Sequence, residues 1–98
     1  MKDIIANINK EFENRIRLGI MSILMVNGWV EFNTLKALLE LTDGNLASHI
    51  TALEKAVYLE VKKEFVGKKP KTTYRVTASG RTAFEEHLNA LEKLIGRK

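Results

Sequence analysis

The sequence predicts an α+β fold, mostly α, in which a helical core carries a small antiparallel sheet with a β-hairpin. Apolar residues recur with the 3.6-residue period of helices over most of the chain. The period changes to two on both sides of a segment that contains Gly67 and Pro70, as in a hairpin. A length of 98 residues without an internal repeat or linker suits one domain, residues 1–98.

The first part of the chain is predicted to be helical from Asp3 to Asn27, with a break near residues 10–13. Asn14 is a good cap for a new helix after the break. Residues 18–26 are apolar almost all round, which is typical of a central core helix. Asn27 and Gly28 are expected to end it, since both tolerate a positive φ.

Two short helices are predicted next. Residues 29–32 form a short β-prone stretch, and Asn33 is expected to cap a helix over residues 34–40. After a tight turn, Thr42 or Asp43 caps the second helix. Two short helices joined by such a turn are the helix-turn-helix pattern.

The second of these helices has two contrasting faces. Spacings of four, three and four place these residues on a buried stripe: Leu46, Ile50, Leu53 and Val57. The outward positions are these: Asn45, Ser48, His49, Thr51 and Ala52. Because these side chains are small, uncharged and mostly hydrogen-bonding, the outward face is suited to close contact with a partner surface.

A β-hairpin is predicted after this helix. One face of its strands is expected to point inward, with these residues: Leu59, Val61, Phe65, Tyr74 and Val76. Thr73 and Arg75 are expected to point outward, and a loop of about six residues, 66–71, carries three lysines. Trp29 is expected to pack against the hairpin.

The basic residues are concentrated in this hairpin. Residues 62–75 hold six basic residues against Glu64 alone, whereas residues 1–61 hold six basic and eight acidic ones. Such clustering, within a net charge of +4, is the electrostatic pattern of a polyanion-binding protein.

The last helix is predicted to run from a cap at Thr77 to about Ile95, where Gly96 stops it and Lys93, Arg97 and Lys98 form a basic end. His87 is expected on its surface or in a dimer interface. The first and last helices carry more apolar surface than so small a domain covers, which predicts a dimer interface of these residues: Ile4, Ile5, Ile8, Phe12, Leu88, Leu91 and Ile95.

Composition argues against several functional classes. The chain has no cysteine, and its two histidines are far apart, so neither a disulfide nor a metal site is expected. It has no phosphate-binding glycine loop, nucleophile elbow or paired-carboxylate motif, so we expect no enzyme and no cofactor. With no apolar run near 20 residues and no signal pattern, we expect a cytoplasmic protein without a membrane partner.

Four segments together resemble the winged helix-turn-helix transcriptional regulators of the MarR/ArsR type, especially minimal prokaryotic members with little beyond the DNA-binding domain. They are Arg17 to Ile20, Leu46 to Ile50 with Leu53 and Glu54, Leu59 to Val61, and Tyr74 to Thr77 with Gly80 and Arg81. No single segment is specific, but their order and spacing match over about two thirds of the chain. Val57 departs from the family, which commonly has glycine after the recognition helix.

The resemblance implies a homodimer whose recognition helices enter successive major grooves, with the hairpin as a wing on flanking DNA. The terminal helices would form the dimer. Such a protein regulates transcription, here as a predicted repressor on a palindromic operator of double-stranded DNA. The sequence does not indicate a small-molecule effector.

The expected DNA contacts fall into two groups. The recognition helix would offer Asn45, Ser48, His49 and Thr51 to the bases, and Asn45 can pair with adenine in bidentate fashion. The wing would neutralise phosphates with Lys62, Lys68, Lys69, Lys71 and Arg75. Two alternatives remain open: a winged-helix module for protein interaction, and a non-specific nucleic-acid binder in a larger complex.

Overall fold

The computed structural model describes residues 1–96; Arg97 and Lys98, expected in the basic end of the last helix, lie outside the described residues. The elements in chain order are α1 (Lys2–Ala6), the 3-10 helix η1 (Lys10–Phe12), α2 (Arg15–Met25), β1 (Val30–Glu31), α3 (Phe32–Leu39), α4 (Asp43–Lys55), β2 (Leu59–Val66), β3 (Lys69–Val76) and α5 (Ala78–Leu94). The predicted α+β class, mostly helical with a small antiparallel sheet, is confirmed.

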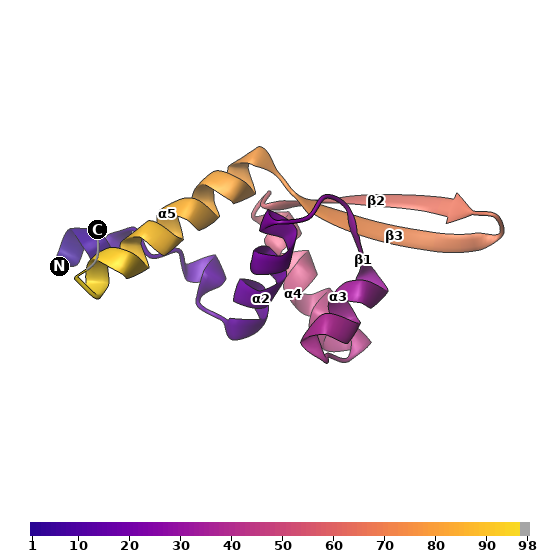
Figure 1. Ribbon diagram of the computed structural model, residues 1–98, viewed down its shortest axis with the longest axis horizontal. Coiled ribbons are helices and arrows are strands. Elements are labelled where there is room, and N and C mark those ends of the chain that lie inside the picture. Colours follow the sequence, from indigo (N-terminus) through magenta and orange to yellow (C-terminus); the bar gives the residue numbers. More distant parts are fainter. Residues whose placement is uncertain (97–98) are drawn as a thin grey trace.

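The molecule is elongated, with extents of 53 × 25 × 21 Å. The β2–β3 hairpin projects at one end, and α1 lies beside the end of α5 at the other (Figure 1). Between them α2, α3 and α4 form the body of the domain (Figure 1). The two expected interfaces, wing and dimer surface, are therefore at opposite ends of the molecule.

The core lies where α2, α3 and α4 meet the base of the sheet. Side chains without solvent exposure are these: Phe12, Ile20, Met21, Leu24, Leu35, Leu46 and Leu53. Burying one such side chain stabilises the fold by about 1.5–3 kcal/mol. Ile20, Met21 and Leu24 lie in the segment 18–26 that was predicted as the central core helix. Leu46 and Leu53 belong to the predicted buried stripe, so α4 is held by the face that we predicted.

Three predicted helix caps are confirmed. The Asn14 side chain accepts hydrogen bonds from the backbone N–H groups of Ile16 and Arg17. Thr42 accepts from the N–H of Asn45, and Thr77 from the N–H of Gly80 at 2.9 Å. Each cap satisfies N–H groups that have no partner within the helix.

Two predicted helix boundaries were wrong. Helix α2 ends at Met25, before Asn27, and Gly28 does not have a positive φ. Helix α3 begins at Phe32, with Glu31 rather than Asn33 as its N-cap residue and no side-chain cap bond. Strand β1 pairs with β3 only through Val30 with Tyr74 and Glu31 with Thr73. It therefore ends one residue before Phe32, which the β propensity of this stretch had placed in the strand.

The sheet has the strand order β1-β3-β2 and is antiparallel throughout. Pairing of β2 with β3 continues to Val66 and Lys69, so the hairpin loop is two residues, not six. Gly67 has φ 67°, and glycine at the first position of a two-residue loop suits a type II′ turn. Pro70 fits in β3 because β1 pairs only with the residues at the base of that strand, leaving an open edge beside the proline.

The hairpin is longer than the core that supports it. Leu59, Tyr74 and Val76 are buried at its base, but Val61 is 37% exposed and Phe65 is 75% exposed, contrary to the inward positions that we predicted. Thr73, predicted to point outward, is only 3% exposed. It is covered because it lies in the central strand between Glu31 and Lys62.

The connection between α4 and β2 is also the point where α5 begins. Thr77 donates from its hydroxyl to the Val57 carbonyl at 2.7 Å and from its N–H to the Tyr58 carbonyl at 3.0 Å. Val57 has φ 65° and is 63% exposed, so its predicted place in the buried stripe was wrong. The chain takes the left-handed conformation here, which explains why a glycine is common at this position in similar proteins.

Two residues between α1 and α2, Asn9 and Phe12, contact α5. Phe12 is fully buried and contacts Phe84 and His87, with ring centroids 5.2 and 5.4 Å away. The N–H of Asn9 donates to His87 Nδ1 at 2.9 Å. His87 is therefore a core residue, only 2% exposed, and its expected surface position was wrong. Phe12 likewise belongs to the core rather than to an exposed dimer surface.

Candidate nucleic-acid interface

The exposed face of α4 forms a shallow hollow of about 510 Å³. Its lining consists of Gly44, Ala47, Ser48, Thr51, Ala52 and Lys55. Leu46, Ile50 and Leu53 hold the opposite face in the core. Since the lining side chains are short except Lys55, another surface can approach the helix backbone closely along this face.

The predicted recognition residues occupy three different positions on α4. Ser48 and Thr51 lie in the hollow, and Asn45 is exposed in the first turn. His49 is only half-exposed and is directed toward α2, where Arg17 Nε donates to its Nδ1 at 3.0 Å. The structure thus brings Ser48 and Thr51 together and places His49 at the border of the core.

Sequence reasoning missed three residues of the hollow: Gly44, Ala47 and Lys55. Their spacing was available as a signal, because residues three, four and seven apart share a helical face. Lys55 is the charged residue of the hollow and lies at the C-terminal end of α4. It adds a cation beside the hydroxyl groups.

The environment of His49 favours the neutral form of its ring. Burial and, secondly, the nearby Arg17 guanidinium lower the pKa of His49. Arg17 is itself paired with Glu11 of η1, with 2.9 Å between Nη1 and Oε1. An ordered chain of contacts therefore runs from η1 through α2 to the edge of the recognition helix.

At the base of the wing, Lys62 and Arg75 contact the Trp29 ring. Lys62 Nζ and Arg75 Cζ each lie 4.5 Å from the Trp29 ring centroid, and Arg75 also pairs with Glu60 at 2.8 Å. The expected packing of Trp29 against the hairpin is confirmed. Cation–π contacts of this kind contribute about 0.5–1 kcal/mol at exposed sites, so Lys62 and Arg75 have a structural role in the wing.

The other wing cations are nearer the tip. Lys71 lies 3.4 Å from Glu31, a half-exposed pair that is worth little in water. Lys63, Lys68 and Lys69 are exposed, and among the described residues they form no salt bridge. Lys63 was counted in the basic segment but was not among the predicted phosphate contacts.

A second hollow, of about 490 Å³, lies between the wing and the start of α3. Lys69, Lys71 and Thr72 contribute to its lining from β3, and Asn33 contributes from α3. The lining of this hollow therefore combines cationic and hydrogen-bonding side chains with the carboxylate of Glu31.

Residues 1–96 were also compared with the requirements of a metal site and of a membrane-spanning helix. Within that range no cluster of three histidine or acidic side chains is placed to hold a metal ion. None of the helices in the described part of the chain is both long enough and apolar enough to cross a membrane.

Comparison with known proteins identifies the family to which this fold belongs. The family model described as "Winged helix DNA-binding domain" matches residues 16–95, from the start of α2 through α5. The chain belongs to this winged-helix family. The match includes both helices of the helix-turn-helix and the whole wing, and it confirms the resemblance to winged helix-turn-helix proteins.

Two relatives match nearly the whole winged-helix chain. An uncharacterised protein of Methanocaldococcus jannaschii is 36% identical over 85 residues, which cover 87% of this chain and 92% of the relative. The structure of a transcriptional regulator homologue from Pyrococcus horikoshii has 30% identity and a TM-score of 0.84, covering 97% of this chain and 92% of its own.

A more distant neighbour shares the fold alone. NadR, solved in complex with 4-hydroxyphenylacetate, has 21% identity and a TM-score of 0.72, covering 98% of this chain and 67% of its own. Together, the family and its regulator neighbours support a DNA-binding transcriptional regulator. Proteins of this family are generally not enzymes.

Proposed function

We propose that this winged-helix protein is a sequence-specific regulator, acting as a repressor, that binds a palindromic operator as a homodimer. The observation that carries the proposal is the hollow face of α4, with Ser48 and Thr51 at its centre, beside a basic wing. Occupying a site that overlaps a promoter would exclude RNA polymerase from it, which is how such a dimer represses.

The α4 face is suited to the major groove. A B-DNA major groove admits one α-helix, and short side chains let that helix reach the base edges. Ser48 and Thr51 can each donate or accept a hydrogen bond, and Asn45 can pair with adenine through two bonds. Lys55 at the end of the same face is suited to a phosphate at the groove edge.

The wing supplies affinity that does not depend on sequence. Lys63, Lys68 and Lys69 are the cations best placed for phosphates, because they are exposed and form no salt bridge within the described part of the chain. Lys71 must exchange Glu31 for a phosphate. Lys62 and Arg75 are occupied by Trp29 and Glu60, so we expect them to contribute least.

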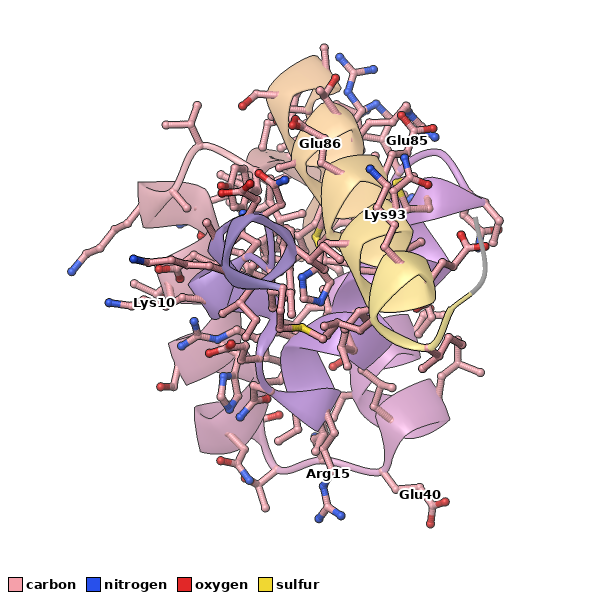
Figure 2. All side chains as sticks on the ribbon, turned by 90° about the vertical axis from the view of Figure 1, so that its left-hand side faces the viewer. Lys10, Arg15, Glu40, Glu85, Glu86 and Lys93 are labelled. Atoms are coloured by element: carbon pink, nitrogen blue, oxygen red, sulfur yellow. The ribbon has the colours of Figure 1, made fainter. Side chains whose placement is uncertain are left out.

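A second copy of the chain is the proposed partner at the opposite end. Ile5 is 56% exposed, Leu88 39% and Ile95 69%, whereas Ile4, Ile8 and Leu91 are half-buried where α1 packs on α5. Figure 2 looks onto this end, where Lys10 of η1 and Glu85 of α5 are exposed and Glu86 and Lys93 line a hollow between α1 and α5. An apolar patch with a charged rim is the usual anatomy of a protein interface.

Selection of bound sequences from a random pool of duplex DNA tests the proposal. We expect enrichment of a palindrome with half-sites about 10 base pairs apart or a multiple of that spacing. Binding without any enriched motif would favour a non-specific binder, and no binding would favour a protein-interaction module. Light scattering at micromolar concentration should give the mass of a dimer; a monomer would contradict the two-fold arrangement.

The dimer surface has a matched pair of variants. Replacing Ile5 and Ile95 by Ser should shift the mass toward the monomer while leaving the secondary structure intact, because both side chains are exposed. Replacing Val66, which is 58% exposed on the wing, by Ser should leave the mass unchanged.

A further inference from the structure

The contact between Arg17 and His49 joins the core helix α2 to the recognition helix α4. Arg17 Nε donates to His49 Nδ1 at 3.0 Å, and Arg17 Nη1 donates to Glu11 Oε1 at 2.9 Å. The Arg17 side chain is 23% exposed and that of Glu11 is 36% exposed, so the pair is partly shielded from water. Both Nε and Nη1 of the guanidinium are therefore engaged before any ligand binds.

The chemistry of arginine decides how the His49 ring is protonated. A guanidinium remains charged and offers N–H donors but no acceptor. Nδ1 must therefore present its lone pair to Arg17, and a neutral ring in this position carries its proton on Nε2. A doubly protonated ring would place an N–H and a positive charge against Arg17. Glu11 does not offset this, because it is on the far side of the guanidinium and already paired with it.

The other ring nitrogen is available to a ligand. None of the hydrogen bonds formed by residues 1–96 uses His49 Nε2, and no buried side-chain nitrogen or oxygen in this range lacks a partner. Nε2 is therefore reached by solvent. Since residues four apart lie on the same side of a helix, His49 is next to Asn45, one turn along α4.

We propose that Arg17 is a specificity-determining residue that acts through His49, holding it as a neutral Nε2–H donor toward the DNA. At the base pair that His49 meets, α4 would then prefer an acceptor, such as guanine N7 or O6 or thymine O4, over an exocyclic amino group. This inference rests on the proposed DNA-binding function. It adds a residue of the core helix to the determinants of site choice.

Loss of Arg17 should change the preference and its pH dependence together. Without the guanidinium, the ring can adopt either tautomer and can take up a proton, so it offers an acceptor or a cation as readily as a donor. Burial and, secondly, Arg17 lower the pKa of His49 in the intact protein, which agrees with this difference. Binding by the wild type should depend less on pH between about 6 and 8 than binding without Arg17, which should strengthen as the pH falls in that range.

The test compares Arg17→Met with two related variants in selection from a random duplex pool. We expect Arg17→Met to reduce the preference at one position in each half-site by about 2- to 10-fold, the value of one hydrogen bond. Arg17→Lys, which keeps a cationic donor, should restore part of it. Arg15→Met is the matched control, because Arg15 is exposed on the same helix and projects away from the domain (Figure 2).

Two results would overturn the inference. One is an Arg17→Met protein that melts like the wild type and keeps the full base preference while His49→Ala loses it. The other is a ¹⁵N imidazole spectrum of the free wild-type protein that shows the proton of His49 on Nδ1. The spectrum needs neither DNA nor a variant that folds, so it decides the matter even if Arg17→Met is unstable. If the wild type enriches no motif at all, the proposed function fails, and the spectrum still tests the Arg17–His49 pairing separately.

Discussion

Helix α4 and the β2–β3 wing both provide candidate DNA contacts, but the domain supports them in different ways. Leu46, Ile50 and Leu53 anchor α4 along its length in the core. The wing is anchored only at its base, and from Val61 to Pro70 every residue is exposed. A side chain on α4 consequently has a position fixed by the core, whereas one near the wing tip depends on the hairpin alone.

This difference suits the two tasks. Recognition of a base edge requires donors and acceptors placed to within a fraction of an ångström, which rigid elements provide. Neutralising phosphates requires charge at approximately the right distance and tolerates movement. The firm attachment of α4 to the core therefore agrees with a role in selecting the DNA sequence. The looser attachment of the wing agrees with a role in supplying affinity.

The largest predicted effect is a loss of stability when a core side chain that anchors α4 is shortened. Leu53→Ala should reduce the free energy of unfolding by about 2–5 kcal/mol, because Leu53 is fully buried. Phe65→Ala on the wing removes a larger side chain but should change stability by less than about 0.5 kcal/mol, since Phe65 is 75% exposed. Urea unfolding measures both; equal losses would contradict the difference in support.

A second prediction concerns the contacts behind the α4–wing connection. Asn9 links His87 on α5 to Tyr58, the residue between Val57 and the start of β2, since its N–H donates to His87 and its side-chain amide donates to the Tyr58 hydroxyl at 2.9 Å. Burial lowers the pKa of His87 from its ordinary value of 6.5, with the Glu13 carboxylate opposing the shift. The pKa of His49 is lowered as well.

The sign of the pH effect follows from these shifts. Above pH 6.5 the two histidines are mostly neutral in both the folded and the unfolded state, so their titration does not reduce the free energy of unfolding. As the pH falls below 6.5, the unfolded chain takes up protons that the folded protein does not, so the free energy of unfolding falls by up to about 1.4 kcal/mol per pH unit for each histidine. The loss ends when the pH reaches the lower folded-state pKa.

Unfolding measured from pH 7.5 to 5 should show this decrease. His87→Gln keeps an acceptor for Asn9 and should flatten the slope, and His49→Gln should flatten it less because His49 is only half-exposed rather than buried. A slope that stays unchanged in His87→Gln would show that the pH dependence comes from other groups.

The smallest effect is predicted at the connection itself. Val57 has φ 65°, and the left-handed conformation costs a non-glycine residue about 1–2 kcal/mol. Val57→Gly should remove this cost at the expense of some chain entropy, for a net gain of about 0.5–1 kcal/mol. Glu40→Gly is the matched control at the other left-handed non-glycine residue, φ 52°, with a smaller gain expected because Glu is not β-branched. Thermal melting compares the two, and a lower melting temperature for Val57→Gly would contradict the strain.

Features determined by neighbouring residues were predictable from the sequence. The caps at Asn14, Thr42 and Thr77 and the buried stripe of α4 depend on residues within one or two helical turns. The cation cluster of the wing was visible in the charge count alone. These features were sufficient to predict the fold and to propose a candidate interface.

Features determined by distant residues were not. The orientation of His49 depends on Arg17, 32 positions away, and the burial of His87 depends on Asn9, 78 positions away. Val61 and Phe65 alternate as in a half-buried strand, but alternation cannot show where the core beneath a hairpin ends. The predicted loop over residues 66–71 was too long for a similar reason. Pro70 can lie within β3 because one edge of that strand is open there, and this is a property of the sheet.

The central claim, that α4 selects the site and the wing supplies affinity, is tested most directly by comparing two double variants over a range of salt concentrations. One carries Asn45→Ala and Ser48→Ala; the other carries Lys68→Ala and Lys69→Ala. The measured quantities are the affinities for the selected operator and for a scrambled duplex. The α4 variant should lose preference for the operator and keep the salt slope. The wing variant should keep the preference, bind both duplexes more weakly, and lose up to about one unit of slope for each phosphate contact removed. The same loss of preference in both variants would contradict the division of roles.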